Sequence, residues 1–256
     1  MATHQLEVAG GVATVTFDRP EALNSLTRDS RRELATELRS LGQRADVRAV
    51  VLTGAGRAFC AGQDLREERA LADVEATIVD TYIPVVEAIH ELRAPVIAAI
   101  NGAAAGAGLS FALACDWRVM ADDAVLMMAF SNIGLVPDSG AAWLLPRIVG
   151  YERAFELAAS GRKVQADEAV ALGLAQQVAP RDEVLAVAQA LAASLAARPP
   201  LAVAWTKQLM REGLSQTLGE TMRREAATQA DAVASADHAE GLQAFAEKRA
   251  ARFEGR

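Results

Sequence analysis

The stretch of sequence that decides the fold is NGAAAGAGLSFALACD, which runs from Asn101 to Asp116. It follows the apolar run Val96–Ile100, which is typical of a buried strand. Asn101-Gly102 ends that strand, and small residues then lead into a segment predicted to be a helix from about Gly108. This order places bare backbone beside the unpaired N–H groups of a helix start. Such a corner can bind an anion, or an oxygen atom that becomes negative during a reaction.

Small residues also permit close packing of a helix on a strand, so this corner alone leaves two interpretations open. A second corner of the same kind is GAGRAFCAGQDL, Gly54 to Leu65, which follows the buried strand predicted over Val47–Thr53. In a parallel sheet, loops at the carboxyl ends of neighbouring strands meet in one crevice. We therefore expect the N–H groups near residues 61 and 107 to point at a single atom.

The order of elements predicts an α/β fold with a helical C-terminal subdomain. Strands alternate with helices over the first two-thirds of the chain, and only helices are predicted after Tyr151. We expect a core over residues 1–195 and a subdomain over residues 196–256 that closes a site or makes an oligomer contact. Thr27 is predicted to cap a helix with leucines on one face and arginines on the other. A helix is also predicted over Ser139–Ile148, which Pro146 should bend or end.

The composition of the 256-residue chain argues against several classes of function. A formal net charge of −7 argues against a nucleic-acid surface. The apolar stretch Ala94–Ala114 is interrupted by Pro95 and Asn101-Gly102, which favours a buried strand and helix over a membrane span. We expect Cys60 and Cys115 to be buried and reduced, and not to form a metal site. No secretory signal opens the chain, so a cytoplasmic location is predicted.

Four motifs occur in one order along the chain: Arg19–Asn24 (RPEALN), Ala61–Leu65 (AGQDL), Asn101-Gly102 with Gly106-Ala107-Gly108, and Gly134–Gly140 (GLVPDSG). Together with the helical tail they resemble the crotonase (enoyl-CoA hydratase/isomerase) superfamily over essentially the whole chain. The resemblance implies a spiral of ββα units, an acyl-CoA thioester as ligand, and a homotrimer or homohexamer. It implies no separate cofactor, because coenzyme A enters as part of the substrate.

The resemblance also implies which residues form the site. The thioester oxygen would be held by the N–H groups of Ala61 and Ala107. Substrate-binding positions would be Glu21, Ala22, Leu23, Gly62, Gln63, Asp64, Leu65, Gly106 and Gly108. Lys248 or Arg249 would meet the phosphates of coenzyme A across a subunit boundary. Asp64 has an alternative interpretation as a loop or cap residue.

The chain departs from the hydratase pattern at two positions. Enoyl-CoA hydratases use two glutamates to activate a water, and the matching positions here are Ser110 and Phe130. The remaining carboxylate is Asp138. This variant resembles the single-aspartate branch that contains enoyl-CoA isomerases and the ring-opening 1,2-epoxyphenylacetyl-CoA isomerase of phenylacetate degradation. There the matching aspartate is the catalytic acid and base.

A single carboxylate suffices to move a double bond, because one base can remove a proton at one carbon and return it at another. We expect Phe130, Leu135, Val136 and Trp143 to desolvate Asp138 and raise its pKa. The alternative is that Asp138 only caps the helix beginning near Ser139. The predicted function is therefore an acyl-CoA isomerase, with an enoyl-CoA hydratase and a catalytically silent acyl-CoA-binding or scaffold protein as alternatives.

Overall fold

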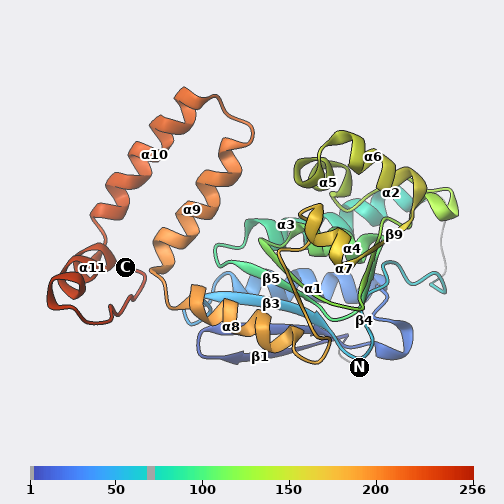
Figure 1. The fold of residues 1–256 in the computed structure, drawn as a ribbon, viewed down its shortest axis with the longest axis horizontal. Helices are drawn as coiled ribbons and strands as arrows, with labels where there is room; N and C mark the ends of the chain where they lie inside the picture. Colours follow the sequence, from blue (N-terminus) through green and yellow to red (C-terminus); the bar gives the residue numbers. More distant parts are fainter. Residues whose placement is uncertain (1–2, 68–72) are drawn as a thin grey trace.

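The computed structural model describes residues 3–67 and 73–256. The sequence also contains a charged run, Arg66–Arg69, that is expected to face solvent, and part of it lies outside the described residues. Within the described residues the strands form two sheets (Figure 1). The larger sheet contains, in spatial order, β1 (His4–Ala9), β2 (Val12–Phe17), β3 (Ala49–Gly54), β5 (Val96–Ile100), β7 (Trp117–Ala121) and β10 (Gln177–Ala179). The smaller sheet contains β4 (Ala58–Cys60), β6 (Ala103–Ala105), β8 (Val125–Met127) and β9 (Lys163–Gln165).

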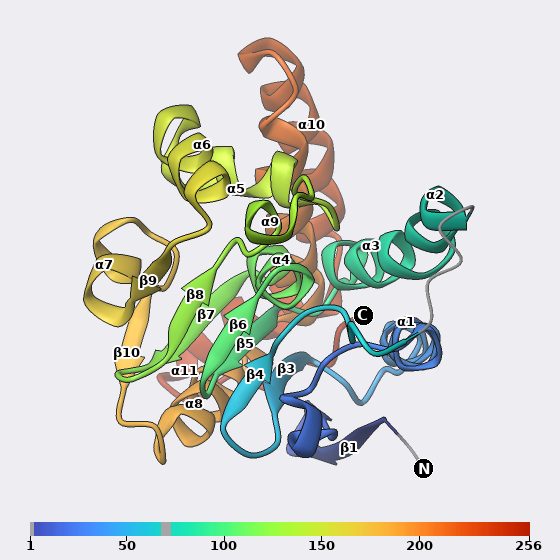
Figure 2. The ribbon, with the colours of Figure 1, turned by 90° about the vertical axis from the view of Figure 1, so that its right-hand side faces the viewer.

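The chain climbs through the two sheets as a spiral. Strands β3, β5 and β7 are parallel neighbours in the larger sheet, and each is followed at once by a parallel strand of the smaller sheet, β4, β6 or β8. Helices return the chain after each turn: α2 (Val74–Thr77), η3 (Ile78–Tyr82), α3 (Ile83–Glu91), α4 (Ala107–Ala114), η4 (Ser131–Ile133) and α5 (Ala141–Val149). Figure 2 shows the helices stacked beside the strands. The α/β class predicted from the sequence is confirmed.

Small residues in the two corners could allow close packing or leave the backbone free to meet a ligand. The glycines of the corners include examples of both. A Cβ on Gly102 would lie 2.1 Å from the carbonyl oxygen of Arg57, and one on Gly108 would lie 2.2 Å from that of Cys60. These two glycines therefore allow consecutive turns of the spiral to touch through bare backbone. Gly106 differs, because its φ of 52° is in the left-handed region and, among the described residues, a Cβ there would contact only Phe130. It turns the chain into α4 without filling the space beside it.

Helix α1 (Arg28–Leu41) begins where the sequence predicts, but the arginine positions around it differ from the prediction. Thr27 and Ser30 form a reciprocal capping box, and the leucines of α1 are buried. The expectation that the arginines face away from the leucines is wrong for Arg31, which is fully buried beside Leu34. An arginine in this position needs internal partners, because an unpaired buried charge is costly.

Helix α5 begins two residues later than predicted and continues through its proline. Ser139 and Gly140 have φ of 51° and 79°, so the chain is left-handed there and the helix starts at Ala141. Of the two outcomes expected at Pro146, a bend or an end, the end does not occur, since α5 runs on to Val149. Helices α6 (Tyr151–Ser160) and α7 (Ala166–Ala171) follow.

The C-terminal helices leave the core in Figure 1. Helix α8 (Val184–Ala196) packs on β3, β5 and β7, whereas α9 (Pro200–Gly213) and α10 (Leu218–Val233) form a projecting pair, and α11 (Ala236–Glu247) ends the chain. Lys207 and Arg211 of α9 fasten this arm by ion pairs of 2.7 Å to Asp116. The boundary between residues 195 and 196 stays a prediction.

The helices were also compared with the length and apolarity that a membrane span needs. Among the described residues no single helix meets both requirements. Helices α8 and α9 meet them only as a pair, which is bent by 106°.

We predict that Gly108→Ala destabilises the protein by about 1–3 kcal/mol, because the added methyl meets backbone that cannot move aside. Gly219→Ala is the matched control: it lies in α10, where the nearest atom to a new Cβ is 3.7 Å away. Gly219→Ala should stabilise the protein by up to about 1 kcal/mol, because alanine has a higher helix propensity than glycine. Urea unfolding measures both changes, and equal effects would contradict the packing role of Gly108.

Candidate functional site

The two Ala/Gly corners meet at the N-terminus of α4. Ala107 is the first residue of that helix, so its N–H has no acceptor within the helix. Gly62 lies directly beside it: a Cβ on Gly62 would lie 2.8 Å from the carbonyl oxygen of Ala105 and 3.4 Å from the nitrogen of Ala107. The absence of a side chain at position 62 therefore leaves space next to the Ala107 N–H.

The structure changes the second donor predicted for this corner. The N–H of Ala61 donates to the carbonyl oxygen of Leu23 at 3.0 Å, so the expectation that it points at the same atom as Ala107 is wrong. Leu26 then pairs with Gln63 as in a parallel sheet, donating to Gly62 and accepting from Asp64. In such a pairing the N–H of Gln63 itself is directed to the side opposite Leu26. The direction of these amides depends on Gly62, whose φ of 85° reverses the chain.

The two segments predicted to bind coenzyme A, Glu21–Leu23 and Ala61–Leu65, lie against each other. Contact is made through the Leu23–Ala61 and Leu26–Gly62 hydrogen bonds. Asn24 holds the loop in place, and the sequence analysis assigned it no role. Its buried side chain donates to the carbonyl oxygens of Ala55 and Ala58 at 3.0 and 2.7 Å. The sequence feature that could have indicated this role is an asparagine just before a buried segment. Asparagine tolerates the left-handed backbone found here, with a φ of 57°.

Asp64 is a structural residue of this loop. Its carboxylate binds Arg66 and Arg19 with nitrogen–oxygen distances of 3.0 Å to each. Hydrogen bonds from the Arg66 guanidinium, assisted by Arg19, hold the pKa of Asp64 well below its usual range. A carboxylate so stabilised is a poor base, and its two ion pairs support the loop interpretation of Asp64. Its role in substrate binding stays a prediction. Leu65, the last residue of the motif, is exposed.

Asp138 is placed as a partly buried carboxylate that has one side-chain hydrogen bond. Burial raises its pKa, while a 2.8 Å hydrogen bond from the Ser139 hydroxyl and the positive charge of Arg31 oppose that rise. The capping alternative is wrong, because the N-cap of α5 is Gly140 and no side chain caps that helix. The carboxylate of Asp138 is therefore not used to start α5.

Four apolar residues were expected to bury this carboxylate. Phe130 is buried, but Leu135, Val136 and Trp143 are exposed, so the expectation is wrong for these three as shields in the single chain.

The two positions that hold glutamates in hydratases carry no charge here. Ser110 is fully buried, and its hydroxyl lies 3.3 Å from the carbonyl oxygens of both Gly106 and Asp138. Phe130 places its ring 3.9 Å from the Cβ position of Gly106. Serine thus ties α4 to the backbone of Asp138, and phenylalanine fills the space beside the corner.

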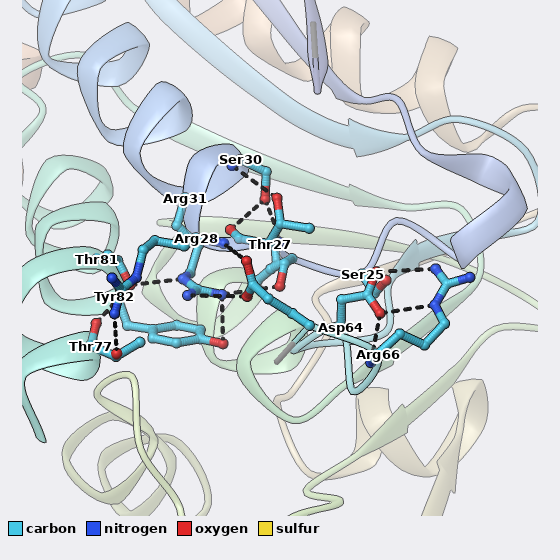
Figure 3. Close-up of polar contacts among 12 residues, drawn as sticks. Ser25, Thr27, Arg28, Ser30, Arg31, Asp64, Arg66, Thr77, Thr81 and Tyr82 are labelled. Carbon is cyan, nitrogen blue, oxygen red and sulfur yellow. Dashed lines mark hydrogen bonds and ion pairs between the residues drawn. The ribbon is translucent and has the colours of Figure 1, made fainter. Parts of the chain in front are cut away.

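A buried polar cluster, which the sequence did not predict, surrounds Arg31 and includes Thr81 and Tyr82 (Figure 3). The guanidinium donates to Thr81 Oγ1 at 2.8 Å, to the Leu26 carbonyl oxygen at 3.0 Å and to Tyr82 Oη at 3.1 Å. It also stacks 4.1 Å above the Tyr82 ring. Burial raises the pKa of Tyr82, and the negative charge of Asp138 adds to that rise. The sequence feature that could have indicated this cluster is the position of Arg31. It lies three residues before Leu34 and therefore on the leucine face of the helix.

Lys248 is not brought to the site within one chain. It ends α11 in a left-handed conformation, and Figure 1 places α11 at the opposite end of the molecule from α4 and α5. Arg249, the other candidate, is already paired with Glu240 and Glu247. A role for either residue therefore depends on a neighbouring subunit.

Other reactive groups contribute little. Cys60 and Cys115 are buried free thiols as expected, and burial raises the pKa of each to about 12, which makes both poor nucleophiles. Within residues 3–67 and 73–256, no group of three His, Cys, Asp or Glu side chains is placed to hold a metal ion.

Comparison with known proteins identifies the family. The sequence model described as enoyl-CoA hydratase/isomerase matches residues 7–256. The chain belongs to the enoyl-CoA hydratase/isomerase family. Members of this family act on acyl-CoA thioesters, as the family's description states. The fold predicted from the motifs, a crotonase-type spiral, is confirmed by solved structures of the family. An enoyl-CoA hydratase from Bacillus anthracis superimposes with a TM-score of 0.96 at 34% identity, covering 99% of this chain and 100% of that one.

Curated relatives of this family carry two different activities in their names. A Rhodobacter capsulatus protein named "probable enoyl-CoA hydratase" is 43% identical over 99% of this chain and 98% of its own length. The 1,2-epoxyphenylacetyl-CoA isomerase of Escherichia coli is 39% identical over 97% of each chain. The names alone therefore leave the reaction open, and the side chains of the site must decide it.

We predict that Asp138→Asn stabilises the protein at pH 7. The folded state raises the pKa of Asp138, so the ionised carboxylate opposes folding at neutral pH. This cost fades as the pH falls through the raised folded value, and it vanishes below the unfolded value of about 3.9, where both states are protonated. Asparagine still accepts from Ser139, so only the charge is removed.

Thermal unfolding of wild type and Asp138→Asn between pH 4 and pH 7 measures the effect. The difference in midpoint should shrink as the pH falls. The exposed Asp80→Asn is the control for the same chemical change. A variant less stable than wild type at pH 7 would contradict the predicted cost.

Proposed function

We propose that this member of the family is an acyl-CoA isomerase that moves a double bond from the 3,4 to the 2,3 position. Asp138 removes a proton from one carbon and returns it to another. The observation that carries the proposal is the state of Asp138, a partly buried carboxylate with a raised pKa and a single side-chain hydrogen bond. A base of this kind is suited to carbon acids near neutral pH.

In the proposed reaction the thioester oxygen lies between two backbone N–H groups, those of Ala107 and Gln63. The free end of α4 supports the first donor, and the pairing of Gln63 with Leu26 supports the second in place of Ala61. Hydrogen bonds to that oxygen stabilise the negative charge that develops when Asp138 takes the proton. Coenzyme A enters with the substrate, and the scheme uses no other cofactor. The coenzyme A part would lie along Glu21–Leu23.

The same residues suit a ring-epoxide thioester, because its rearrangement also needs a polarised thioester and a movable proton. The relatedness to the Escherichia coli 1,2-epoxyphenylacetyl-CoA isomerase favours this second substrate. Hydration of a 2-enoyl-CoA, which the name of the Rhodobacter capsulatus relative suggests, would need a second carboxylate to activate water. Ser110 and Phe130 do not supply one.

We further propose that the enzyme works in the cytoplasm as a homotrimer or homohexamer. The region from α9 to α11 exposes large apolar side chains that one chain does not cover, among them Met210, Leu214, Leu218, Met222 and Phe245. An interface over these helices would allow Lys248 of one subunit to reach coenzyme A bound to another.

We predict that Asp138→Asn lowers the rate of 3-hexenoyl-CoA isomerisation about 10²–10⁴-fold, the usual contribution of a positioned acid–base group. Formation of the conjugated 2-enoyl thioester is followed by its ultraviolet absorbance. Asp80→Asn, an exposed aspartate on the helix that carries Tyr82, should retain the wild-type rate.

Full activity of Asp138→Asn would refute the role of Asp138. Incubation with 2-hexenoyl-CoA in ¹⁸O-labelled water tests the hydratase alternative. Labelled 3-hydroxyhexanoyl-CoA, with no isomerisation of 3-hexenoyl-CoA, would identify a hydratase. Tight binding of 3-hexenoyl-CoA without turnover of that thioester, of 2-hexenoyl-CoA or of the ring-epoxide thioester would identify a silent acyl-CoA-binding protein.

A further inference from the structure

The buried cluster around Arg31 contains more hydrogen-bond donors than acceptors. Tyr82 Oη accepts from Arg31 Nη1 at 3.1 Å, so the hydroxyl hydrogen of Tyr82 must be directed elsewhere. Among the described residues, that hydrogen has no acceptor. Arg31 Nη2 is likewise buried without a hydrogen-bond partner in the described part of the chain; Glu67 Oε2 lies 3.9 Å away. Both side chains are more than nine-tenths buried.

Tyr82 is fixed in position by its backbone and by Arg31. It ends a π-helical segment, Ile78–Tyr82, in which Thr81 also binds the Thr77 carbonyl oxygen at 2.7 Å. Single π-helical turns inside helices occur frequently at functional sites. Figure 3 shows Thr81, Tyr82 and Arg31 joined in one network. The hydroxyl of Tyr82 is thus held rigidly, as a group that recognises a ligand must be.

The cluster lies close to Asp138. The Tyr82 ring contacts that of Phe111, with centroids 6.4 Å apart, and Phe111 follows Ser110, whose hydroxyl reaches the backbone of Asp138. Helix α4 packs between α3 and α5. Tyr82 directly precedes α3, and Asp138 lies in the loop just before α5. The negative charge of Asp138 acts on both Tyr82 and Arg31. Tyr82 and Asp138 therefore flank the same part of α4.

We propose that Tyr82, held by Arg31, is a specificity-determining hydrogen-bond donor for acyl groups that carry an oxygen atom, such as an epoxide, ether or hydroxyl, next to the carbons facing Asp138. The proposal rests on the acyl-CoA site proposed above. The positive charge of Arg31 on Tyr82 Oη strengthens the hydroxyl as a donor. A purely hydrocarbon acyl chain would leave that donor unpaired in a buried place, which disfavours its binding.

The test compares the binding of two thioesters that differ by one oxygen, phenylacetyl-CoA and (2-hydroxyphenyl)acetyl-CoA, by titration calorimetry. Wild type should bind the hydroxylated thioester about 10-fold to 100-fold more tightly, the usual cost of leaving a buried donor unpaired. Tyr82→Phe removes only the hydroxyl and keeps the ring on Phe111. It should abolish this preference while changing the affinity for phenylacetyl-CoA by less than about 2-fold.

Two further variants make the result specific. Tyr151→Phe removes the other tyrosine hydroxyl of the chain, which is exposed, and should leave the preference unchanged. Arg31→Lys keeps the charge but loses the planar group that holds Tyr82, Thr81 and Leu26 together, so the preference should weaken. Wild type without a preference, or Tyr82→Phe with equal losses for both thioesters, would overturn the proposal.

Binding is measured without turnover, so the outcome is separate from that of the proposed reaction. If Asp138→Asn kept full isomerase activity, the function proposed above would fail while the Tyr82 preference stood. If Asp138→Asn lost activity and Tyr82→Phe kept the preference, only the role of Tyr82 would fail.

Discussion

The contact on which the site depends is made by bare backbone between consecutive turns of the spiral. Gly108 lies so close to the carbonyl of Cys60 that a Cβ would be 2.2 Å from its oxygen, and Gly62 faces Ala105 and Ala107 in the same way. Because no side chain fits between these segments, the first N–H of α4 is held next to the AGQDL loop. The donors of the proposed site are thus positioned by the packing of the core and need no catalytic side chain of their own.

The proposed chemistry beside this backbone depends on one charged group, the carboxylate of Asp138. Asp138 loses hydration on burial, and only the Ser139 hydroxyl and the more distant Arg31 offset that loss. Such a carboxylate is costly for folding and useful for proton transfer, which is a common trade-off at active sites. The buried Arg31 also orders Tyr82, so one cation lies near the proposed base, Asp138, and holds the proposed donor, Tyr82. In the proposed scheme, fold, charge balance and substrate choice therefore meet around α4.

Much of this arrangement follows from sequence patterns that are local. The apolar run Val96–Ile100 predicts a buried strand. The family resemblance of the motifs that carry Gly62, Ala107 and Asp138 implies the spiral and its ligand class. What could not be predicted depends on distant contacts: the amide of Ala61 turns toward Leu23 because of pairing through Leu26, which no local pattern encodes. Strands such as Ala58–Cys60 are too short to show a period. Arg31 was misplaced because a charge normally indicates the exposed face of a helix.

The most direct test is a crystal structure of the Asp138→Asn protein with 3-hexenoyl-CoA bound. The account predicts the thioester oxygen within about 2.7–3.1 Å of the backbone nitrogens of Ala107 and Gln63, the usual spacing of such donors. It also predicts that the side chain of residue 138 faces the carbons between which the double bond moves. A thioester oxygen bound elsewhere, or an acyl chain that runs away from residue 138, would contradict it.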